Sequence, residues 1–322
     1  LMFFGVNEPL THFGTSFDGG SWAPLAGAEG DAAGAEALAM AATIFHWGLH
    51  PWAIYAVVAL SLALFSFNKG LPLSMRSVFY PILGERVWGW PGHVIDILAV
   101  FATLFGLATS LGLGATQAAA GLTYLFDAPE SDITMILLIV GITIIAIGSI
   151  LAGVDKGVQL LSKINIAMAA ALLFFVIAVG PTLLIATGFF ENLWNYAVHL
   201  PALSNPFGRE DANFSQGWTA FYWAWWISWS PYVGMFDQYV SQGIEAVRDA
   251  GVDLQLFVML EQLPLSQITS FIAIILVIIF FVTSSDSGSL VIDSITAGGK
   301  VDAPKPQRVF WAIIEGAIAI AL

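Results

Sequence analysis

The chain has no cysteine and very little charge. Only 10% of its 322 residues are charged, whereas ordinary globular chains carry about 25%. The absence of cysteine excludes disulfides, thiolate metal sites and cysteine nucleophiles. The sparse charge, together with a hydrophobic fraction of 58%, excludes a water-soluble domain. With 10 basic residues against 23 acidic ones, no basic patch for nucleic acid is present either. The composition therefore predicts a membrane protein.

Apolar runs long enough to cross a bilayer recur along the chain. A spanning helix needs about 20 residues. Windows of about 19 residues give spans near residues 42–66, 94–124, 133–153, 164–188, 215–236, 268–283 and 307–322. Residues 1–9 have the character of the end of a further span, and no signal peptide is visible. We expect residues 1–322 to form one multi-pass domain in the plasma (inner) membrane.

Lysine and arginine are concentrated in alternate loops, as the positive-inside rule requires. Three segments that carry them are expected to be cytoplasmic: 67–90, 154–163 and 299–308. Three acidic segments are expected to be external: 10–38, 126–132 and 189–212. Within the last of these, residues 189–200 are aromatic and amphipathic but too short to span. We expect them to form an interfacial helix.

The alternation of loop charge fails once. The span at 215–236 should end in the cytoplasm, yet residues 237–262 are acidic with a single arginine, which is the character of an external loop. The simplest explanation is that one spanning helix is absent between Phe236 and Asp237. The alternatives are a re-entrant segment or a loop that does not obey the charge rule.

An unusually aromatic segment, from Phe221 to Tyr232, lies within the fifth span. It holds four tryptophans within seven residues, whereas interfacial belts place tryptophan at the ends of spans. On a helix three of these indoles share one side, and Pro231 frees a carbonyl one turn earlier. A quaternary ammonium group held by aromatic rings gains about 2 kcal/mol when desolvated. We favour a cation cage over simple helix packing, with rings from Trp223, Trp225, Trp226 and Trp229.

A second aromatic set accompanies two histidines in the first span. The rings are those of Trp47, Trp52 and Tyr55, and an interfacial belt is an adequate alternative explanation for the two tryptophans. His46 and His50 lie four residues apart, a spacing that can bind zinc. A proline follows at once and a third ligand is not evident. We therefore expect hydrogen-bonded structural histidines and no transition metal.

Hydroxyl groups and a carboxylate occur together near the end of the sixth span, at residues 283–289. Polar groups this close to hydrocarbon are costly unless they serve one another, a helix cap or an ion. Hard cations favour such oxygen ligands, and capping is the alternative. Glu8 and Asp96 are interpreted as helix-end acids with a capping role. The common enzyme motifs for serine hydrolases, phosphate-binding loops and zinc proteases are missing.

The string from Phe221 to Phe236 resembles the signature of the betaine/carnitine/choline transporter family. Further similar stretches follow the same order along the chain, at residues 5–13, 45–55, 110–114 and 283–289. The likeness is greatest to the sodium-coupled glycine betaine transporters. It implies an all-α polytopic membrane protein with LeuT-like inverted five-helix repeats after two leading helices, twelve in all, assembled as a homotrimer.

The resemblance also assigns segments and residues. Residues 42–188 would complete the first repeat, 189–212 would be the interfacial helix and linker, and 213–322 the second repeat, without its ninth helix. The substrate cage would consist of Trp225, Trp226 and Trp229 with Trp223 beside it. The external pathway would be bracketed by Trp47, Trp52 and Tyr55. One sodium ion would bind at Phe280, Thr283 and Ser284, and a second at Thr103 and Tyr232. Leu107 stands where two-sodium members carry a hydroxyl, which places the second ion in doubt.

We therefore expect a secondary active symporter, not an enzyme and without a cofactor, that imports a quaternary ammonium compatible solute by alternating access. Glycine betaine is the expected substrate and sodium the coupling ion, with membrane lipid and copies of the same chain as partners. The alternatives are a proton-coupled choline carrier, a sodium-independent carnitine carrier and a dimethylsulfoniopropionate carrier. Outside the class of secondary transporters, the alternatives are a membrane metalloenzyme that uses His46 and His50, and a passive channel.

Overall fold

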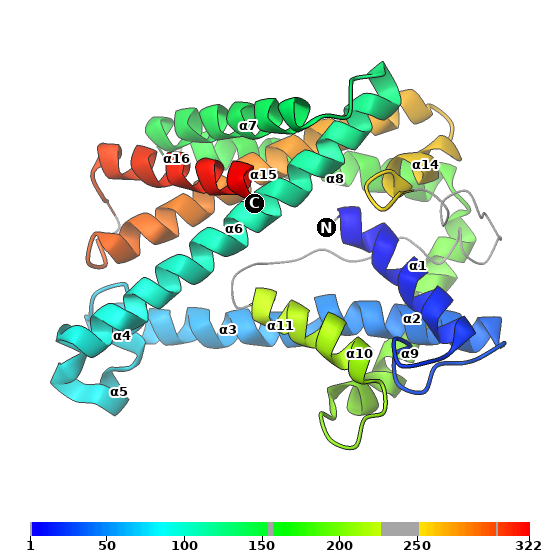
Figure 1. Cartoon of the computed structure of the whole chain (residues 1–322), viewed down its shortest axis with the longest axis horizontal. Coiled ribbons are helices and arrows are strands. Elements are labelled where there is room, and N and C mark those ends of the chain that lie inside the picture. Colours follow the sequence, from blue (N-terminus) through cyan, green and yellow to red (C-terminus); the bar gives the residue numbers. More distant parts are fainter. Residues whose placement is uncertain (1, 154–156, 227–250, 301) are drawn as a thin grey trace. The chain divides into compact units, whose positions relative to one another are not determined.

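The structure, a computed structural model, describes residues 2–153, 157–226, 251–300 and 302–322. Every regular element in these residues is a helix, which confirms the all-α expectation (Figure 1). The chain divides into two compact units. Unit 1 comprises Leu1–Ile54 and Ala171–Phe271, and unit 2 comprises Tyr55–Ala170 and Ile272–Leu322.

Five helical segments of the described chain are long and apolar enough to cross a membrane. They are Ala32–Asn68, Trp90–Phe126, Asp132–Ala152, Gln159–Val179 and Ser266–Thr296. The first joins α2 (Ala32–Trp47), α3 (Leu49–Ala63) and η1 (Leu64–Asn68), and the others are α6, α7, α8 and α15. All five overlap expected spans, as a multi-pass membrane protein requires. The last expected span corresponds to α16 (Lys305–Ala321), and the span at 215–236 is described only as far as Trp226.

One expected span and the interfacial helix after it have different boundaries in the structure. Helix α8 (Gln159–Val179) is followed by a break, and α9 (Thr182–Ser204) then runs as one helix. Pro181 lacks the N–H that would continue α8. The Thr182 hydroxyl donates to the Ile177 carbonyl at 2.6 Å, which closes the turn. Hydropathy windows do not register such a break, so the expected interfacial segment belongs to a longer helix.

Helix α2 lies at the centre of unit 1. Its sequence is rich in alanine, which lets α1 (Met2–Asp18) and α9 approach it closely, and Figure 1 shows α1 beside α2. The core combines residues of α2, α9 and α10 (Ala212–Phe214), namely Ala41, Ala42, Ile44, Phe45, Tyr196, Leu203 and Phe214. Helix α1 continues to Asp18, beyond the expected end of its span at residue 9.

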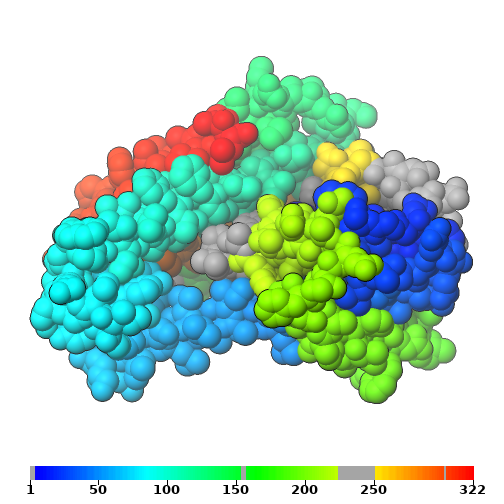
Figure 2. All heavy atoms as spheres, turned by 60° about the horizontal axis from the view of Figure 1, so that its bottom comes forward, coloured from blue at the N-terminus to red at the C-terminus, as the bar shows by residue number. Residues whose placement is uncertain are grey.

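The ion pair of Arg209 and Asp211 joins two loops of unit 1. Arg209 donates from Nε and Nη2 to the two carboxylate oxygens of Asp211, at 2.8 and 2.5 Å, and from Nη1 to the Leu203 carbonyl at 2.7 Å. Asp211 also accepts the backbone N–H of Leu25 at 2.7 Å. Because a bidentate pair of this kind fixes geometry, the loop after α1 is held against the loop after α9. Figure 2 shows the dark blue N-terminal residues and the yellow-green residues before α11 side by side.

Glycines allow the helices of unit 2 to pack closely. In α6 (Trp90–Phe126) Gly114 faces the Phe281 ring of α15 (Ser266–Thr296), and Gly316 of α16 faces Thr143 of α7 (Asp132–Ala152). A Cβ at either glycine would overlap the opposing side chain. Small residues at such contacts are the usual means by which membrane helices approach each other. Helices α6, α7 and α16 accordingly contact one another (Figure 1).

Asp96 does not cap its own helix, contrary to the interpretation from sequence, and instead accepts a first-turn backbone N–H of another helix, α4 (Met75–Val78). It lies beyond the first turn of α6, where its carboxylate accepts the backbone N–H and Nε of Arg76 at 2.9 and 2.5 Å. The pair holds α4 (Met75–Val78) against α6, in the loop that also contains α5 (Tyr80–Leu83) and η2 (Gly84–Trp88).

We expect Gly114→Ala to destabilise the protein and Gly112→Ala not to. The new Cβ at position 114 overlaps the Phe281 ring, and overpacking of this kind costs about 1–3 kcal/mol. Nothing lies within 4 Å of a Cβ at Gly112, where alanine gains about 1 kcal/mol of helix propensity. Thermal unfolding of both variants in detergent measures the difference. Equal midpoints would contradict the close packing of α6 on α15.

Candidate functional site

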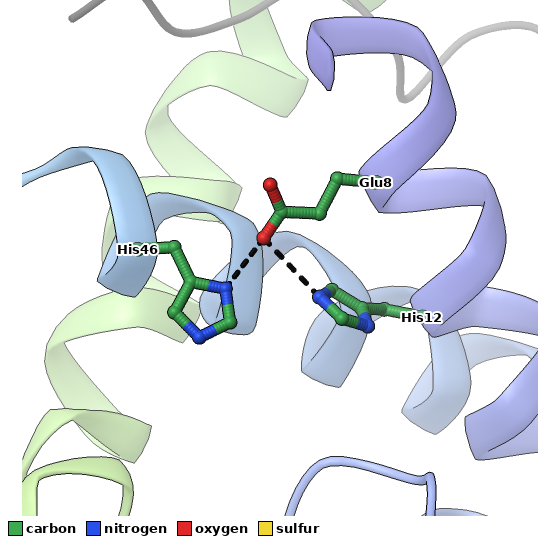
Figure 3. A group of neighbouring side chains, drawn as sticks. All are labelled: Glu8, His12 and His46. Carbon is green, nitrogen blue, oxygen red and sulfur yellow. Dashed lines mark hydrogen bonds and ion pairs between the residues drawn. The ribbon is translucent and has the colours of Figure 1, made fainter. Parts of the chain in front are cut away.

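A single buried carboxylate, that of Glu8 in α1, brings three helices of unit 1 together. Its side chain is fully buried, and Figure 3 shows it directed at two histidines. Oxygen Oε1 accepts from His46 Nδ1 at 2.5 Å and lies 3.2 Å from His12 Nε2. Oxygen Oε2 accepts from Trp47 Nε1 at 2.6 Å and from the Tyr222 hydroxyl at 2.7 Å. Four hydrogen-bonding groups from α1, α2 and α11 (Phe221–Trp226) therefore converge on one acid.

These contacts compensate for the burial of a charge. An ionised carboxylate only accepts hydrogen bonds, and each hydrogen bond to a charged group contributes about 1.5–3 kcal/mol. Because Glu8 accepts from it, His46 carries a proton on Nδ1. In the neutral ring Nε2 then accepts from the Thr219 hydroxyl at 2.9 Å. The Glu8 network thus extends from α1 through α2 to η4 (Ser215–Ala220).

Aromatic rings enclose this carboxylate. Tyr222 is fully buried and meets Trp47 and Phe4 edge-on, with ring centroids 5.4 and 5.8 Å apart. Trp218 meets the His12 ring in a T-shaped contact at 4.9 Å. Edge-to-face contacts are favourable for aromatic pairs. The beginning of the aromatic segment is therefore held both by ring packing and by a hydrogen bond to a charge.

Trp223, the next residue along α11, contacts a different part of unit 1. Its indole stacks on His50, with centroids 5.8 Å apart and an interplanar angle of 8°, and lies 6.0 Å from Phe45. His50 Nε2 is 3.2 Å from the Ser204 hydroxyl of α9. The buried Nε1 of Trp223 has no hydrogen-bond partner in the described chain. This N–H is available to an acceptor group of a ligand.

The two histidines of the first span do not converge on one site. Helix α2 ends at Trp47, and α3 begins after Gly48. Pro51 has no N–H to donate to the Trp47 carbonyl, so helical spacing does not carry from His46 to His50. The first ring belongs to the Glu8 network and the second to the contact with α9, which agrees with the expectation of hydrogen-bonded histidines.

Glu8, His12 and His46 form the group of described residues whose metal-ligating atoms come together, within 4.8 Å of one another. All four contacts of the carboxylate are already occupied, however, and both ring nitrogens of His46 are hydrogen-bonded. The arrangement is that of a hydrogen-bonded network.

The other residues expected to contact substrate are only partly described. Trp52 in α3 is 56% exposed, and Tyr55 is half-buried in unit 2. The side chains of Trp225 and Trp226, and the whole of Trp229 and Tyr232, lie outside the described residues. So does the junction between residues 236 and 237. The cage and the missing span therefore stay predictions.

In unit 2 the residues expected to bind sodium lie on two helices. Phe280, Thr283 and Ser284 follow one another in α15, where the Thr283 hydroxyl donates to the Phe280 carbonyl at 2.8 Å. The Thr103 hydroxyl in α6 donates to the backbone of its own helix at 2.8 Å. Leu107, one turn further on, is buried and supplies no side-chain oxygen. Both sodium sites stay predictions.

Glu8 and His12 are the functional candidates that sequence analysis missed. The sequence indicates a helix-end capping acid at Glu8, but α1 continues on both sides of Pro9, so the acid lies within the helix. A usable signal was present: an acid and a histidine four residues apart share a helix face. In an apolar helix such an acid must find donors.

Comparison with known proteins decides the class of this protein. A family model described as BCCT, betaine/carnitine/choline family transporter, matches residues 1–248 and 238–322. The chain belongs to the betaine/carnitine/choline transporter family. This family consists of transporters and not of enzymes, which removes the metalloenzyme alternative and confirms the resemblance seen in the sequence.

Several relatives within the family are similar over the whole of this chain. A protein of Vibrio parahaemolyticus named glycine betaine/proline/choline transporter is 58% identical over 367 positions, which cover 66% of that protein. Glycine betaine transporter 1 of the same organism is 50% identical over 369 positions and 68% of its length. The glycine betaine transporter OpuD of Bacillus subtilis is 38% identical, over 69% of its length. The chain thus spans about two thirds of these betaine/carnitine/choline transporters.

For this family member we expect Glu8→Gln to lower the thermal unfolding midpoint strongly. The amide replaces one acceptor oxygen by an NH₂ group that faces two donors, and each lost hydrogen bond to a charge costs about 1.5–3 kcal/mol. Glu29→Gln, at an exposed acid of the same unit, is the matched control. Thermal unfolding in detergent compares them. A Glu8 variant as stable as the control would show that the network does not hold α1, α2 and α11 together.

Proposed function

We propose that the protein is a secondary active symporter that imports glycine betaine together with sodium. Family membership supports a transporter, and several relatives are named for glycine betaine. The observation that carries the proposal is the position of the aromatic segment: its first residues are fixed by the Glu8 network, immediately before the tryptophans proposed as the cage. A fixed start to α11 would hold those rings in one arrangement, which lowers the entropic cost of binding.

The chemistry of glycine betaine suits the groups available in this region. Its trimethylammonium group is attracted to indole faces, which Trp225, Trp226 and Trp229 would supply. Its carboxylate needs a donor, and the Trp223 indole N–H is buried without a partner in the described chain. Choline has no carboxylate and would leave this donor unsatisfied, at a cost of about 1–3 kcal/mol. These features favour betaine over choline, while carnitine and dimethylsulfoniopropionate also carry a carboxylate.

Sodium is proposed as the coupling ion because α15 offers hydroxyl oxygens and no positive charge. Phe280, Thr283 and Ser284 would hold one ion through oxygen ligands. Helix α15 contains no lysine or arginine that could replace the ion. A second ion at Thr103 and Tyr232 is the weaker part of the proposal, since Leu107 offers no ligand.

The fold of the whole transporter is proposed on the same basis. LeuT-like inverted repeats, a homotrimer and a location in the plasma membrane follow from the resemblance. One further spanning helix between Phe236 and Asp237 is supported by the charge of the loops. It is also supported by the two-part family match and by alignments with more positions than the chain has residues.

An inward sodium gradient is expected to drive accumulation of labelled glycine betaine in proteoliposomes that contain the full-length transporter. Thr283→Ala should lower the apparent sodium affinity at least about tenfold, the loss typical of a disturbed metal shell. Ser287→Ala, at an exposed hydroxyl of the same helix, is the control. Uptake that does not depend on the sodium gradient and is driven by a proton gradient would support a proton-coupled carrier instead. Uptake without accumulation would indicate a channel.

Trp226→Ala is expected to raise the KM for betaine uptake at least about tenfold. One desolvated cation–π contact contributes about 2 kcal/mol, and each 1.4 kcal/mol corresponds to about tenfold in affinity. Trp90→Ala, at an indole that is 75% exposed, controls for the loss of a large ring. Competition by choline, carnitine and dimethylsulfoniopropionate in the same assay ranks the substrates. An unchanged KM would place the cage elsewhere.

A further inference from the structure

Unit 2 contains two buried carboxylates that the proposed transport mechanism does not use. Asp286 in α15 is 0% exposed and Glu315 in α16 is 1% exposed. The two interact electrostatically across the contact between these helices. Glu315 Oε2 accepts a hydrogen bond from the Ser289 hydroxyl at 3.2 Å, whereas both carboxylate oxygens of Asp286 lack a hydrogen-bond partner. An ionised carboxylate that is buried in an apolar interior without a hydrogen-bond partner is costly, because a buried charge needs a compensating partner.

Among the described residues of the surrounding helices, no basic side chain is placed to neutralise the pair. The three helices around it, α7, α15 and α16, contain only two basic residues, Lys305 and Arg308, both in the first turn of α16. Arg308 is engaged elsewhere, with Asp293 at 3.1 Å and Asp302 at 2.9 Å. Lys305 is exposed. Any positive charge that compensates for ionised carboxylates at this pair therefore comes from outside the described side chains of these helices.

An independent observation on a third helix also indicates a ligand. Ser149 of α7 is 6% exposed and interacts with Asp286, yet neither its hydroxyl nor the carboxylate makes a hydrogen bond of normal geometry. Ser285 is directed at Glu315 and is buried as well. An unused hydroxyl beside an unused carboxylate, both away from water, is the arrangement expected where a bound group supplies the missing contacts. Helices α7 and α16 lie side by side here (Figure 1).

The geometry points to a site for a hard metal cation, bound through the carboxylates of Asp286 and Glu315 and the hydroxyls of Ser149, Ser285 and Ser289. All these ligand atoms are oxygens, which sodium and calcium prefer over the softer transition metals. The site differs from the sodium site proposed at Thr283 and Ser284 and does not depend on the identity of the transported solute.

The periodicity of α15 separates the two sites. With 3.6 residues per turn, Ser285, Asp286 and Ser289 share one face of the helix. Thr283 and Ser284 lie outside this face, and their partial burial contrasts with the full burial of the acid site. One helix thus carries two sets of oxygen ligands that point in different directions.

The test uses the purified full-length transporter with Thr283→Ala as the background, so that the proposed coupling site does not contribute. Thermal unfolding is followed at constant ionic strength while N-methylglucamine chloride is replaced by sodium chloride, and in a second series while calcium chloride is added. A cation that binds the folded state raises the midpoint in a saturable way. We expect one of the two cations to do so, and the series that saturates identifies it.

Adding Glu315→Gln to this background is expected to lower the apparent cation affinity at least about tenfold. Adding Ser287→Ala, at the exposed hydroxyl, should leave it unchanged. If Glu315→Gln does not fold, Ser149→Ala removes one hydroxyl ligand and touches neither carboxylate, with the same expected loss. The proposal is overturned if neither cation stabilises the background protein, or if Glu315→Gln keeps the full response. It is also overturned if, with neither cation present, Glu315→Gln raises the unfolding midpoint as much as a saturating cation raises that of the background protein. The two acids would then share a proton in place of a cation.

Discussion

A buried carboxylate must be matched by donors, and in unit 1 the donors to Glu8 decide where three helices lie. The acid is on α1, two of its partners are on α2, and one is the tyrosine that opens the aromatic segment of α11. Each of these bonds is directional, so the helices can neither rotate nor slide without breaking one of them. The alanine-rich surface of α2 then permits the close packing that keeps water away from the network.

Glu8 in unit 1 and Asp286 in unit 2 are both buried acids, but their surroundings differ. In unit 1 every acceptor position of Glu8 is used by groups from α1, α2 and α11. In unit 2 Asp286 and Ser149 are equally buried and unused. Fully satisfied polar groups specify a structure, whereas unsatisfied ones leave free energy available to a ligand. The difference separates a group that fixes the fold from groups that are suited to binding.

Sequence predicted the features that depend on composition within one segment. The long apolar runs became helices α6, α7, α8 and α15, because length and apolarity are enough to identify them. Boundaries were less predictable, since the break at Pro181 comes from the absence of one N–H group and leaves the average hydropathy unchanged. Trp47 and Tyr222 were noticed only as members of two separate aromatic sets.

The Glu8 network could not be predicted because its members are distant in sequence. His46 and Trp47 lie 38 and 39 positions from the acid, and Tyr222 lies 214 positions away. No periodicity links such positions. The lack of partners at Asp286 is hidden for the same reason, since a sequence shows which groups are polar and does not show which remain unpaired after packing.

The interruption at Gly48 separates two kinds of environment along what is otherwise one long apolar segment. Before it, α2 is buried and hydrogen-bonded to Glu8; after it, Pro51 is the buried residue of α3, and Trp52 is exposed. Because Pro51 withholds one backbone hydrogen bond at this point, a bend here strains fewer hydrogen bonds than a bend within the regular helix α2. A tilt of α3 would therefore displace His50 and its stacking on Trp223, while His46 and Trp47 would stay in place. A bend at Gly48 would in this way leave the contacts of α2 with Glu8 undisturbed.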